Sequence, residues 1–377
     1  MSNLLLKILD SPIMVYFMIV GRGDQMKKII KDFMPMGGRH CITNALKQIF
    51  HYYGCHLSEE MIFGLGEGLD FTYINLSSSP MVSGRTKIME FEDVLAQRLG
   101  IELKFRKGKD YDEIFRTTKS MIDADQPVFV YADMPYLPYL SLGESGHFGG
   151  HAVVIFGYDD EQENFYVSDR DNSDYSINTP GGEIGEDYHC VGYECMKNAR
   201  SSSFRPFPAN NKYIAKAEFG GYQGVKPDML LQAVWGVCGK MLSPSAKLKG
   251  VCGIEKFSKE IVKWSSFDIE KRKLAGVTNY FQISKDGGTG GGIFRKMYGD
   301  FLQEAAGILD NNMFEKCAAG YKDLSGRWEC LADDMWSLSA DGDAGRLSKM
   351  SLEIKKLQEI EFDLLTNLKI ECEALLG

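Results

Sequence analysis

Hydrophobic and polar positions along the first half of the chain alternate with periods that predict both helices and strands. Apolar side chains recur at spacings of three and four between residues 42 and 53, which predicts one buried helix face ending near Gly54. Further segments follow the helical or the strand period: helices at 91–100 and 111–125, and strands at 101–106 and 126–133.

A β-hairpin is predicted near the middle of the chain. Residues 151–158 form a continuous apolar run of strand length, residues 159–164 are polar, and residues 165–169 form a second short run. Such a pair of runs around a polar turn is typical of two antiparallel strands.

The pattern changes after a segment rich in Ser, Pro and Asn at 198–211, which we interpret as a domain boundary. Beyond it, strand signals become rare, and the last stretch from Arg346 has the spacing of a long amphipathic helix. We therefore expect an α+β fold with a catalytic domain at 26–204 and a mainly helical domain at 205–377, with residues 1–25 as an N-terminal extension. Met26 is a candidate for the true start of the protein.

Composition narrows the class of protein. The 377 residues suffice for two domains, and 44% hydrophobic with 25% charged residues is ordinary for a globular protein. A formal net charge of -9 argues against nucleic-acid binding and favours cationic small molecules. Nine cysteines, an odd number without CxxC spacing, predict free thiols and a cytoplasmic location. The apolar run at 13–20 is too short to cross a membrane, and no membrane association is expected.

Cys41 stands where a helix is predicted to begin, in the stretch "GGRHCITNALKQIFHYYG". The free N–H groups and positive dipole end of a helix stabilise a thiolate, and Arg39 and His40 add positive charge. The same N–H groups could hold an oxyanion during acyl transfer. On this stretch alone, Cys41 is equally well explained as a small apolar residue at a helix start.

A base and an orienting acid are available in the predicted hairpin. His151 opens the first strand, and Asp169 ends the second, with the midpoint between them in the polar turn. The two residues are therefore predicted to be cross-strand neighbours, so that the carboxylate orients the imidazole toward Cys41. A Cys–His–Asp arrangement is that of a nucleophile, its base and an orienting acid. The alternatives are a histidine that caps a strand, and an aspartate that is a solvated strand end or pairs with Arg170.

Other motifs give weaker evidence for a functional site. The glycine-rich segment 286–295 has Ile293 where a phosphate-binding loop requires lysine. His147 and His151 form HxxxH without the glutamate of HExxH, and His189 with its neighbouring cysteines lacks zinc-site spacing, so we expect no metal. The aromatic segment 133–140 is either a wall of the substrate pocket or a loop stiffened by proline.

Several long motifs resemble one family. "GRHCITNALKQIFHYYGCHLSEEMIFGLGEGLDFTY", "MPYLPYLSLGESGHFGGHAVVIFGYDDE" and "YVSDR" resemble the N-terminal domain of the butirosin biosynthesis protein H family. "GTGGGIFRKMYGDFLQEAAGIL" and "YKDLSGRWECLADDMW" resemble the helical domain that accompanies it. The resemblance covers nearly all of residues 26–377.

The resemblance implies a papain-like cysteine fold used for acyl transfer. Family members take an acyl group from the phosphopantetheine thioester of an acyl carrier protein and place it on an amine, which is an aminoglycoside in butirosin and a simpler amine, such as a diamine, in other relatives. The family's nucleophile, base and orienting acid fall on Cys41, His151 and Asp169. No bound cofactor is implied, and we expect the helical domain to cap the cleft. A homo-oligomer is compatible with the sequence.

We expect six further residues to line the substrate site: His40, Gly66, Gly68, Tyr136, Tyr139 and Gly150. One departure from the papain-like pattern is Pro35, which stands where those proteases often carry the oxyanion glutamine. Residues 104–110 with Arg85 and Lys87 form a candidate basic patch for an acidic carrier protein, with an ordinary solvated surface as the alternative. The same triad would also serve a cysteine peptidase or amidase, and an inactive binding or resistance protein on this scaffold is the non-enzymatic alternative.

Overall fold

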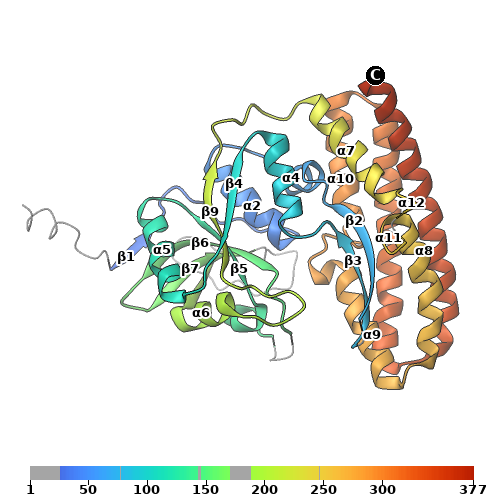
Figure 1. Ribbon diagram of the computed structural model, residues 1–377, viewed down its shortest axis with the longest axis horizontal. Helices are drawn as coiled ribbons and strands as arrows, with labels where there is room; N and C mark the ends of the chain where they lie inside the picture. The colour runs from blue at the N-terminus through green and yellow to red at the C-terminus, as the bar shows by residue number, and fades with distance from the viewer. Residues whose placement is uncertain (1–25, 77, 143–145, 170–187, 246) are drawn as a thin grey trace, which may run out of the picture.

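The computed structural model describes residues 26–76, 78–142, 146–169, 188–245 and 247–377. The predicted N-terminal extension, residues 1–25, lies outside the described residues. Figure 1 shows two neighbouring parts, one built around a β-sheet and the other a bundle of long helices. The expected succession of a mixed α and β part and a helical part is confirmed.

The main sheet is antiparallel at each of its strand pairs. Its strand order is β4-β9-β5-β6-β7-β8, and β1 pairs with the C-terminal end of β6. The strands are β1 (Lys27–Ile29), β4 (Glu102–Lys107), β5 (Val128–Ala132), β6 (His151–Asp159), β7 (Asn164–Ser168), β8 (His189–Gly192) and β9 (Lys212–Glu218). Strands β5, β6 and β7 are buried along their whole length, which explains their continuous apolar runs.

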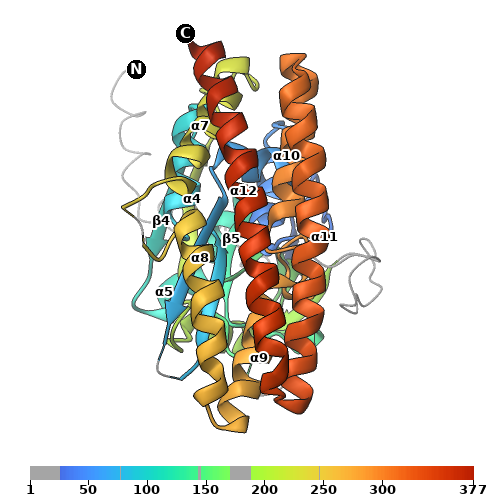
Figure 2. The same cartoon turned by 90° about the vertical axis from the view of Figure 1, so that its right-hand side faces the viewer.

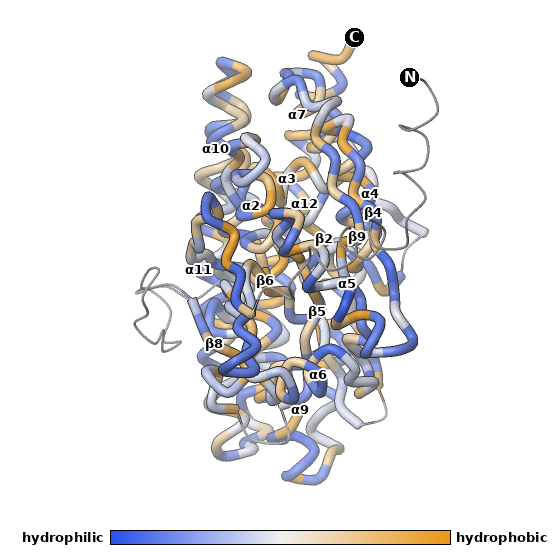
Figure 3. The backbone as a smooth tube through the Cα atoms, turned by 90° about the vertical axis from the view of Figure 1, so that its left-hand side faces the viewer, coloured by the Kyte–Doolittle hydropathy of each residue, from blue (hydrophilic) through white to orange (hydrophobic). Residues whose placement is uncertain are grey.

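Among the described residues, five helices precede the C-terminal bundle: α2 (Cys41–Tyr52), α3 (Glu59–Leu65), α4 (Glu90–Leu99), α5 (Tyr111–Asp123) and α6 (Tyr193–Ser201). The predicted apolar face of α2 is buried from Ile42 to Phe50 and packs on the sheet beside β6, whereas Tyr53, just after the helix, is exposed. Burial of such an apolar stripe, more than intrinsic helix propensity, stabilises a twelve-residue helix. In Figure 3 the elements of this part lie in front of the bundle.

Strand β9 differs from the sequence-based expectation, because it lies beyond residue 205, where strand signals are rare. It enters the sheet between β4 and β5. Its sequence, KYIAKAE, carries three charged side chains, and only two of its seven residues are buried. Because of these charged residues, apolar and polar positions do not alternate regularly, and this alternation is the sequence signal of a strand.

A separate hairpin, β2 (Leu69–Asn75) and β3 (Pro80–Arg85), lies against the helices of the C-terminal part (Figure 1). The Tyr73 N–H donates to the Leu248 carbonyl at 2.9 Å. The buried Asn279 side chain accepts from the Val82 N–H at 3.0 Å and donates to the Pro80 carbonyl at 2.9 Å. Backbone and amide bonds therefore join the two parts of the chain.

Six long helices form the C-terminal part, with α11 and α12 side by side along its length (Figure 2). They are α7 (Pro227–Met241), α8 (Gly250–Ile261), α9 (Ile269–Ile283), α10 (Arg295–Leu309), α11 (Asn312–Asp341) and α12 (Leu347–Leu376). The long amphipathic helix predicted from residue 346 is α12. Within the described residues, no helix combines the length and the apolar character needed to cross a membrane.

Short 3-10 turns complete the described elements. They are η1 (Met134–Tyr136), η2 (Pro138–Leu140), η3 (Val262–Ser266), η4 (Lys285–Gly287) and η5 (Ala344–Arg346). The turns η1 and η2 give the proline-containing aromatic segment a defined backbone between β5 and β6.

Candidate active site

Cys41 is the first residue of α2 and is 8% exposed. The helix is capped by His40, whose backbone is extended and whose side chain accepts from the Thr43 N–H. The His40 ring therefore satisfies one of the donors at the helix start. Cys41 thus lies at the positive end of the helix dipole, where a thiolate is stabilised.

His151 and Asp169 lie at the same end of the hairpin formed by β6 and β7. Ser168 is opposite Val154, so the two residues are diagonal neighbours across the strands and not directly opposite each other. His151 is the first residue of β6, and Asp169 directly follows β7. Their side chains meet with Nε2 of His151 2.6 Å from Oδ2 of Asp169, and both residues are 1% exposed. The side chain of His151 also hydrogen-bonds Cys41. The structure therefore brings the three predicted residues together.

The charge state of His151 follows from these two neighbours. Burial alone would lower its pKa, but the Asp169 carboxylate and the Cys41 side chain together raise it to about 10. The imidazole is thus protonated at neutral pH. A protonated imidazole beside a cysteine favours the thiolate.

Asp169 is fixed by contacts from two further elements. The Tyr139 hydroxyl donates to the same Oδ2 at 2.7 Å, and Nδ2 of Asn44 donates to the Asp169 backbone carbonyl at 3.1 Å. Asn44 also donates to the Met36 carbonyl at 2.8 Å. Because Asn44 lies one helical turn after Cys41, it ties the nucleophile's helix to the acid of the site. Asn44 lies off the apolar face predicted for this helix, so no sequence signal pointed to this role.

Glu59 is a buried carboxylate that the sequence analysis did not identify. It accepts from the backbone N–H groups of Arg39 and His40, at 2.8 and 3.2 Å, and from the Thr43 hydroxyl at 2.9 Å. Burial raises its pKa. These bonds hold the two residues that precede Cys41, and nothing in the local pattern at Glu59 beyond its place after the helix cap Ser58 points to this role.

The helical part contacts the same segment. The Phe294 ring lies edge-on to the His40 ring, with centroids 5.1 Å apart, and stacks on Phe63 at 5.5 Å. Phe294 has a left-handed backbone with φ 72°. The Arg39 guanidinium forms an ion pair with Asp300 of α10 at 2.7 Å. The glycine-rich segment that ends at Phe294 thus supports the start of α2.

Two of the six residues expected to line the substrate site touch the Cys–His–Asp group directly or through α2. His40 caps the nucleophile's helix, and Tyr139 donates to Asp169 while its ring stacks on His189 at 3.6 Å. Tyr136 lies in η1 with its ring 5.8 Å from that of His147.

The three glycines of that set are sites of close packing. A Cβ on Gly66 would lie 2.3 Å from the Phe91 ring, and one on Gly68 would lie 2.4 Å from the Phe63 ring. A Cβ on Gly150 would lie 3.0 Å from the Phe148 ring. Aromatic side chains fill the space at each of these positions, so their part in substrate binding stays a prediction.

Tyr131 of β5 and Glu92 of α4 form a second buried hydrogen-bonded pair. The Tyr131 hydroxyl donates to the buried Glu92 carboxylate at 2.7 Å, and Cys41 contributes to the electrostatic environment of Tyr131. Desolvation, with Glu92 as the next cause, raises the pKa of Tyr131 well above its ordinary value, and burial raises that of Glu92. Tyr131 is therefore a neutral, buried donor to Glu92.

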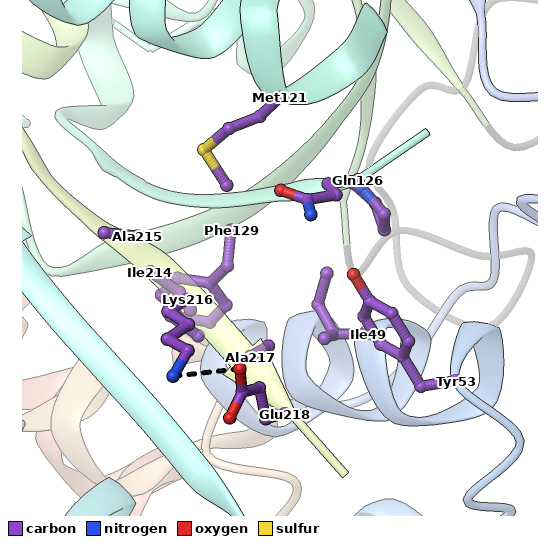
Figure 4. Close-up of a pocket in the computed structure, with 11 residues that line it drawn as sticks. Ile49, Tyr53, Met121, Gln126, Phe129, Ile214, Ala215, Lys216, Ala217 and Glu218 are labelled. Atoms are coloured by element: carbon purple, nitrogen blue, oxygen red, sulfur yellow. Dashed lines mark ion pairs between the residues drawn. The ribbon is translucent and has the colours of Figure 1, made fainter. Parts of the chain in front are cut away.

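One cavity among the described residues lies away from the Cys–His–Asp group (Figure 4). It has a volume of about 220 Å³ and lies at the other end of α2, beside Ile49 and Tyr53. Ile49 is roughly 12 Å along the helix axis from Cys41. The Lys216–Glu218 ion pair borders this cavity at 2.9 Å. We therefore do not assign it to the Cys41 site.

The residues of the motifs considered for metal binding make other contacts in the structure. His147 pairs through Nδ1 with the buried Asp133 at 2.8 Å and stacks on Phe204. In the part of the chain that the structure describes, no three His, Cys, Asp or Glu side chains are grouped so as to hold a metal ion.

Comparisons with known families agree with this architecture. Residues 40–170 match the N-terminal domain of butirosin biosynthesis protein H, and residues 194–368 match a domain of unknown function, DUF4872. The chain matches no curated protein at a significant level. With these two domains in this order, the chain belongs to the butirosin biosynthesis protein H family. Its family points to an enzyme of antibiotic biosynthesis.

Proposed function

We propose that the chain is a cysteine-dependent acyltransferase that moves an acyl group from a carrier-protein thioester to an amine. The observation that carries the proposal is the buried contact of 2.6 Å between His151 and Asp169, with Cys41 hydrogen-bonded to the same imidazole. A cysteine at a helix start and a histidine opening a strand also support a papain-like assignment for the sheet part.

In the first half-reaction, the Cys41 thiolate attacks the thioester carbonyl. The tetrahedral intermediate collapses, the C–S bond to pantetheine breaks, and His151 gives its proton to the departing thiolate. The products are acyl-Cys41, a free pantetheine thiol and a neutral imidazole. N–H groups at the start of α2 are the candidates to stabilise the oxyanion.

In the second half-reaction, an amine attacks the acyl-Cys41 carbonyl. The neutral His151 takes the proton from the attacking nitrogen, the bond between sulfur and the acyl carbon breaks, and the thiolate and imidazolium return. A thioester is already activated, so no nucleoside triphosphate is consumed. The formal net charge of -9 supports an aminoglycoside or polyamine as the acceptor.

The test is intact-mass analysis after mixing the protein with butyryl-pantetheine. The proposal predicts one butyryl adduct, mapped to Cys41, that is absent from the Cys41→Ala variant. Cys330 is exposed on α11 and provides the matched control, since Cys330→Ala should acylate like the native chain. No adduct, or an adduct that persists in Cys41→Ala, would contradict the proposed chemistry.

A further inference from the structure

Arg39, two residues before Cys41, is held from both parts of the chain. Its backbone N–H donates to the Glu59 carboxylate at 2.8 Å. Its guanidinium nitrogen Nη1 lies 2.9 Å from Oε1 of Glu60 in α3 and 2.7 Å from Oδ2 of Asp300 in α10. The sequence predicted that Arg39 adds positive charge beside the nucleophile, and the structure places its guanidinium between two carboxylates. Arg39 therefore links the start of α2 to a helix of the C-terminal part.

Asp300 is the acceptor at which this link ends. Nζ of Lys296 lies 3.0 Å from the same Oδ2, and Nζ of Lys322 lies 3.4 Å from Oδ1. Burial opposes ionisation of Asp300, but the hydrogen bonds from Arg39 and Lys296 outweigh it and lower the pKa of this carboxyl. Asp300 is thus ionised at neutral pH, and only 20% of its side chain is exposed. Salt therefore screens this ion pair less than a fully exposed one.

The helix that carries Asp300 packs closely against α3. In Figure 1, α10 lies on the side of the bundle that faces the sheet part. A Cβ on Gly64 of α3 would lie 2.1 Å from the Phe301 ring of α10, so the two helices touch at that glycine. The hydroxyl of Ser58, the N-cap of α3, donates to Glu304 of α10 at 2.7 Å. These contacts fix Asp300 relative to the helix that holds the Arg39 backbone.

The start of α10 is also held rigidly beside His40. Phe294, the N-cap of α10, meets the His40 ring edge-on at 5.1 Å. Ile293 and Phe294 both have left-handed backbones, with φ 50° and 72°. Such a conformation is costly for a β-branched residue and persists only where the surrounding contacts determine it. Here the Ile293 N–H donates to the Ile283 carbonyl at 2.7 Å, and Nη1 of Arg295 donates to the Ile293 carbonyl at 2.8 Å.

We propose that Asp300 is a positioning residue for Cys41 that acts through Arg39, so that the C-terminal domain of unknown function helps to place the nucleophile. The proposal rests on the nucleophilic role of Cys41 proposed above. Loss of the ion pair frees the Arg39 side chain and loosens the turn that sets the direction of the Cys41 sulfur. A small misplacement of a reacting group slows a reaction strongly, because the reactants must meet in one geometry.

Positioning and simple electrostatics predict opposite results when the charge of Asp300 is removed. The carboxylate is a negative charge near the start of α2, so its loss in Asp300→Asn would by itself favour a Cys41 thiolate. If Asp300 acts through its field alone, Cys41 reacts faster or at the native rate. If Asp300 positions Arg39, Cys41 reacts more slowly. The pH dependence is retained in that case, because His151 and Asp169 are unchanged.

The test measures acylation of Cys41 by butyryl-pantetheine and its alkylation by iodoacetamide between pH 5.5 and 9, both in the full chain. In Asp300→Asn, the maximal acylation rate should fall about tenfold without a change in the half-saturating donor concentration. Alkylation should slow with the native pH dependence. Asp300→Glu, which keeps the charge and the acceptor oxygens, should recover most of the rate. Arg39→Gln should slow acylation at least as much as Asp300→Asn, and the double variant should be no slower than Arg39→Gln.

Lys322→Gln is the matched control, because Lys322 pairs with the other oxygen of Asp300 and comes from α11. It should react like the native chain. Native or faster kinetics in Asp300→Asn, or losses that multiply in the double variant, overturn the proposal. A lower midpoint of urea unfolding with native acylation kinetics also overturns it, because the ion pair would then be structural only.

The alkylation assay keeps this proposal separate from the acyltransferase function. If the native chain is never acylated but Asp300→Asn slows alkylation of Cys41 and adds nothing to Arg39→Gln, the acyltransferase function fails and the positioning role stands. Equal acylation and alkylation of Cys41 in the native chain and in Asp300→Asn give the reverse result.

Discussion

Replacing Asp169 by asparagine should remove the thiolate character of Cys41 while preserving the shape of the site. In the native chain, Asp169 and Cys41 raise the pKa of the buried His151 to about 10. Without the carboxylate, burial dominates and lowers the His151 pKa, so the imidazole is neutral at pH 7. A neutral imidazole no longer favours the Cys41 thiolate, so the thiolate fraction of Cys41 at pH 6.5 should fall.

The assay is the rate of iodoacetamide alkylation at Cys41 between pH 5.5 and 9, measured by mass spectrometry of the modified peptide. The native rate should stay high up to pH 9, because the imidazolium that favours the thiolate is lost only as the pH rises through about 10. Asp169→Asn should react many times more slowly at pH 6.5 and speed up as the pH rises, because its thiol must first ionise. Cys330, which is exposed on α11, should react at the same rate in both proteins.

Two results would refute this reasoning. A native profile that rises tenfold per pH unit through 8.5 would mean that Cys41 is an ordinary thiol. A flat profile in Asp169→Asn would mean that the carboxylate does not set the charge of His151. Acylation by butyryl-pantetheine should fall in parallel, by roughly 10² to 10⁴, since breaking a buried charged pair costs about 3–5 kcal/mol.

Three further variants test the surroundings of the triad. Tyr139→Phe removes the donor to Asp169 and should lower the free energy of unfolding by about 2 kcal/mol and slow acylation about tenfold, measured by urea denaturation and intact mass. Glu59→Gln loses the charged acceptor for the segment before Cys41, so acylation should slow about tenfold or more, whereas an unchanged rate would make Glu59 a purely structural residue. Phe294→Ala should cost about 3 kcal/mol of stability and also slow acylation, and a loss of stability with native acylation kinetics would contradict its support of the helix start.

Sequence reasoning located the site because its members lie on short-range patterns. Helical spacing placed Cys41 at a helix start, and the symmetry of the apolar runs around the polar turn placed His151 opposite Asp169. Both inferences depend on contacts within one helix or one hairpin, where the local period and the turn determine the register. The structure shows the same helix start and brings the hairpin ends to 2.6 Å.

The supporting shell could not be predicted because its members meet through the tertiary fold. Glu59 follows Cys41 by one helix and a loop, and it accepts a hydrogen bond from the segment before Cys41. Phe294 belongs to the C-terminal half of the chain and contacts His40. Strand β9 enters the middle of the sheet from beyond the predicted boundary, so its pairing with β4 has no local signal. Long-range register is set by packing between elements, which a single sequence does not display.

The fate of the acyl-enzyme tests the central claim most directly. After Cys41 is loaded with a butyryl group and excess donor is removed, loss of the adduct is followed by mass in buffer alone and with a diamine such as putrescine. The acyltransferase account predicts that the amine discharges acyl-Cys41 many times faster than water and forms butyryl-putrescine in equal amount. Discharge to butyrate at the same rate with and without the amine would contradict it and indicate a hydrolase.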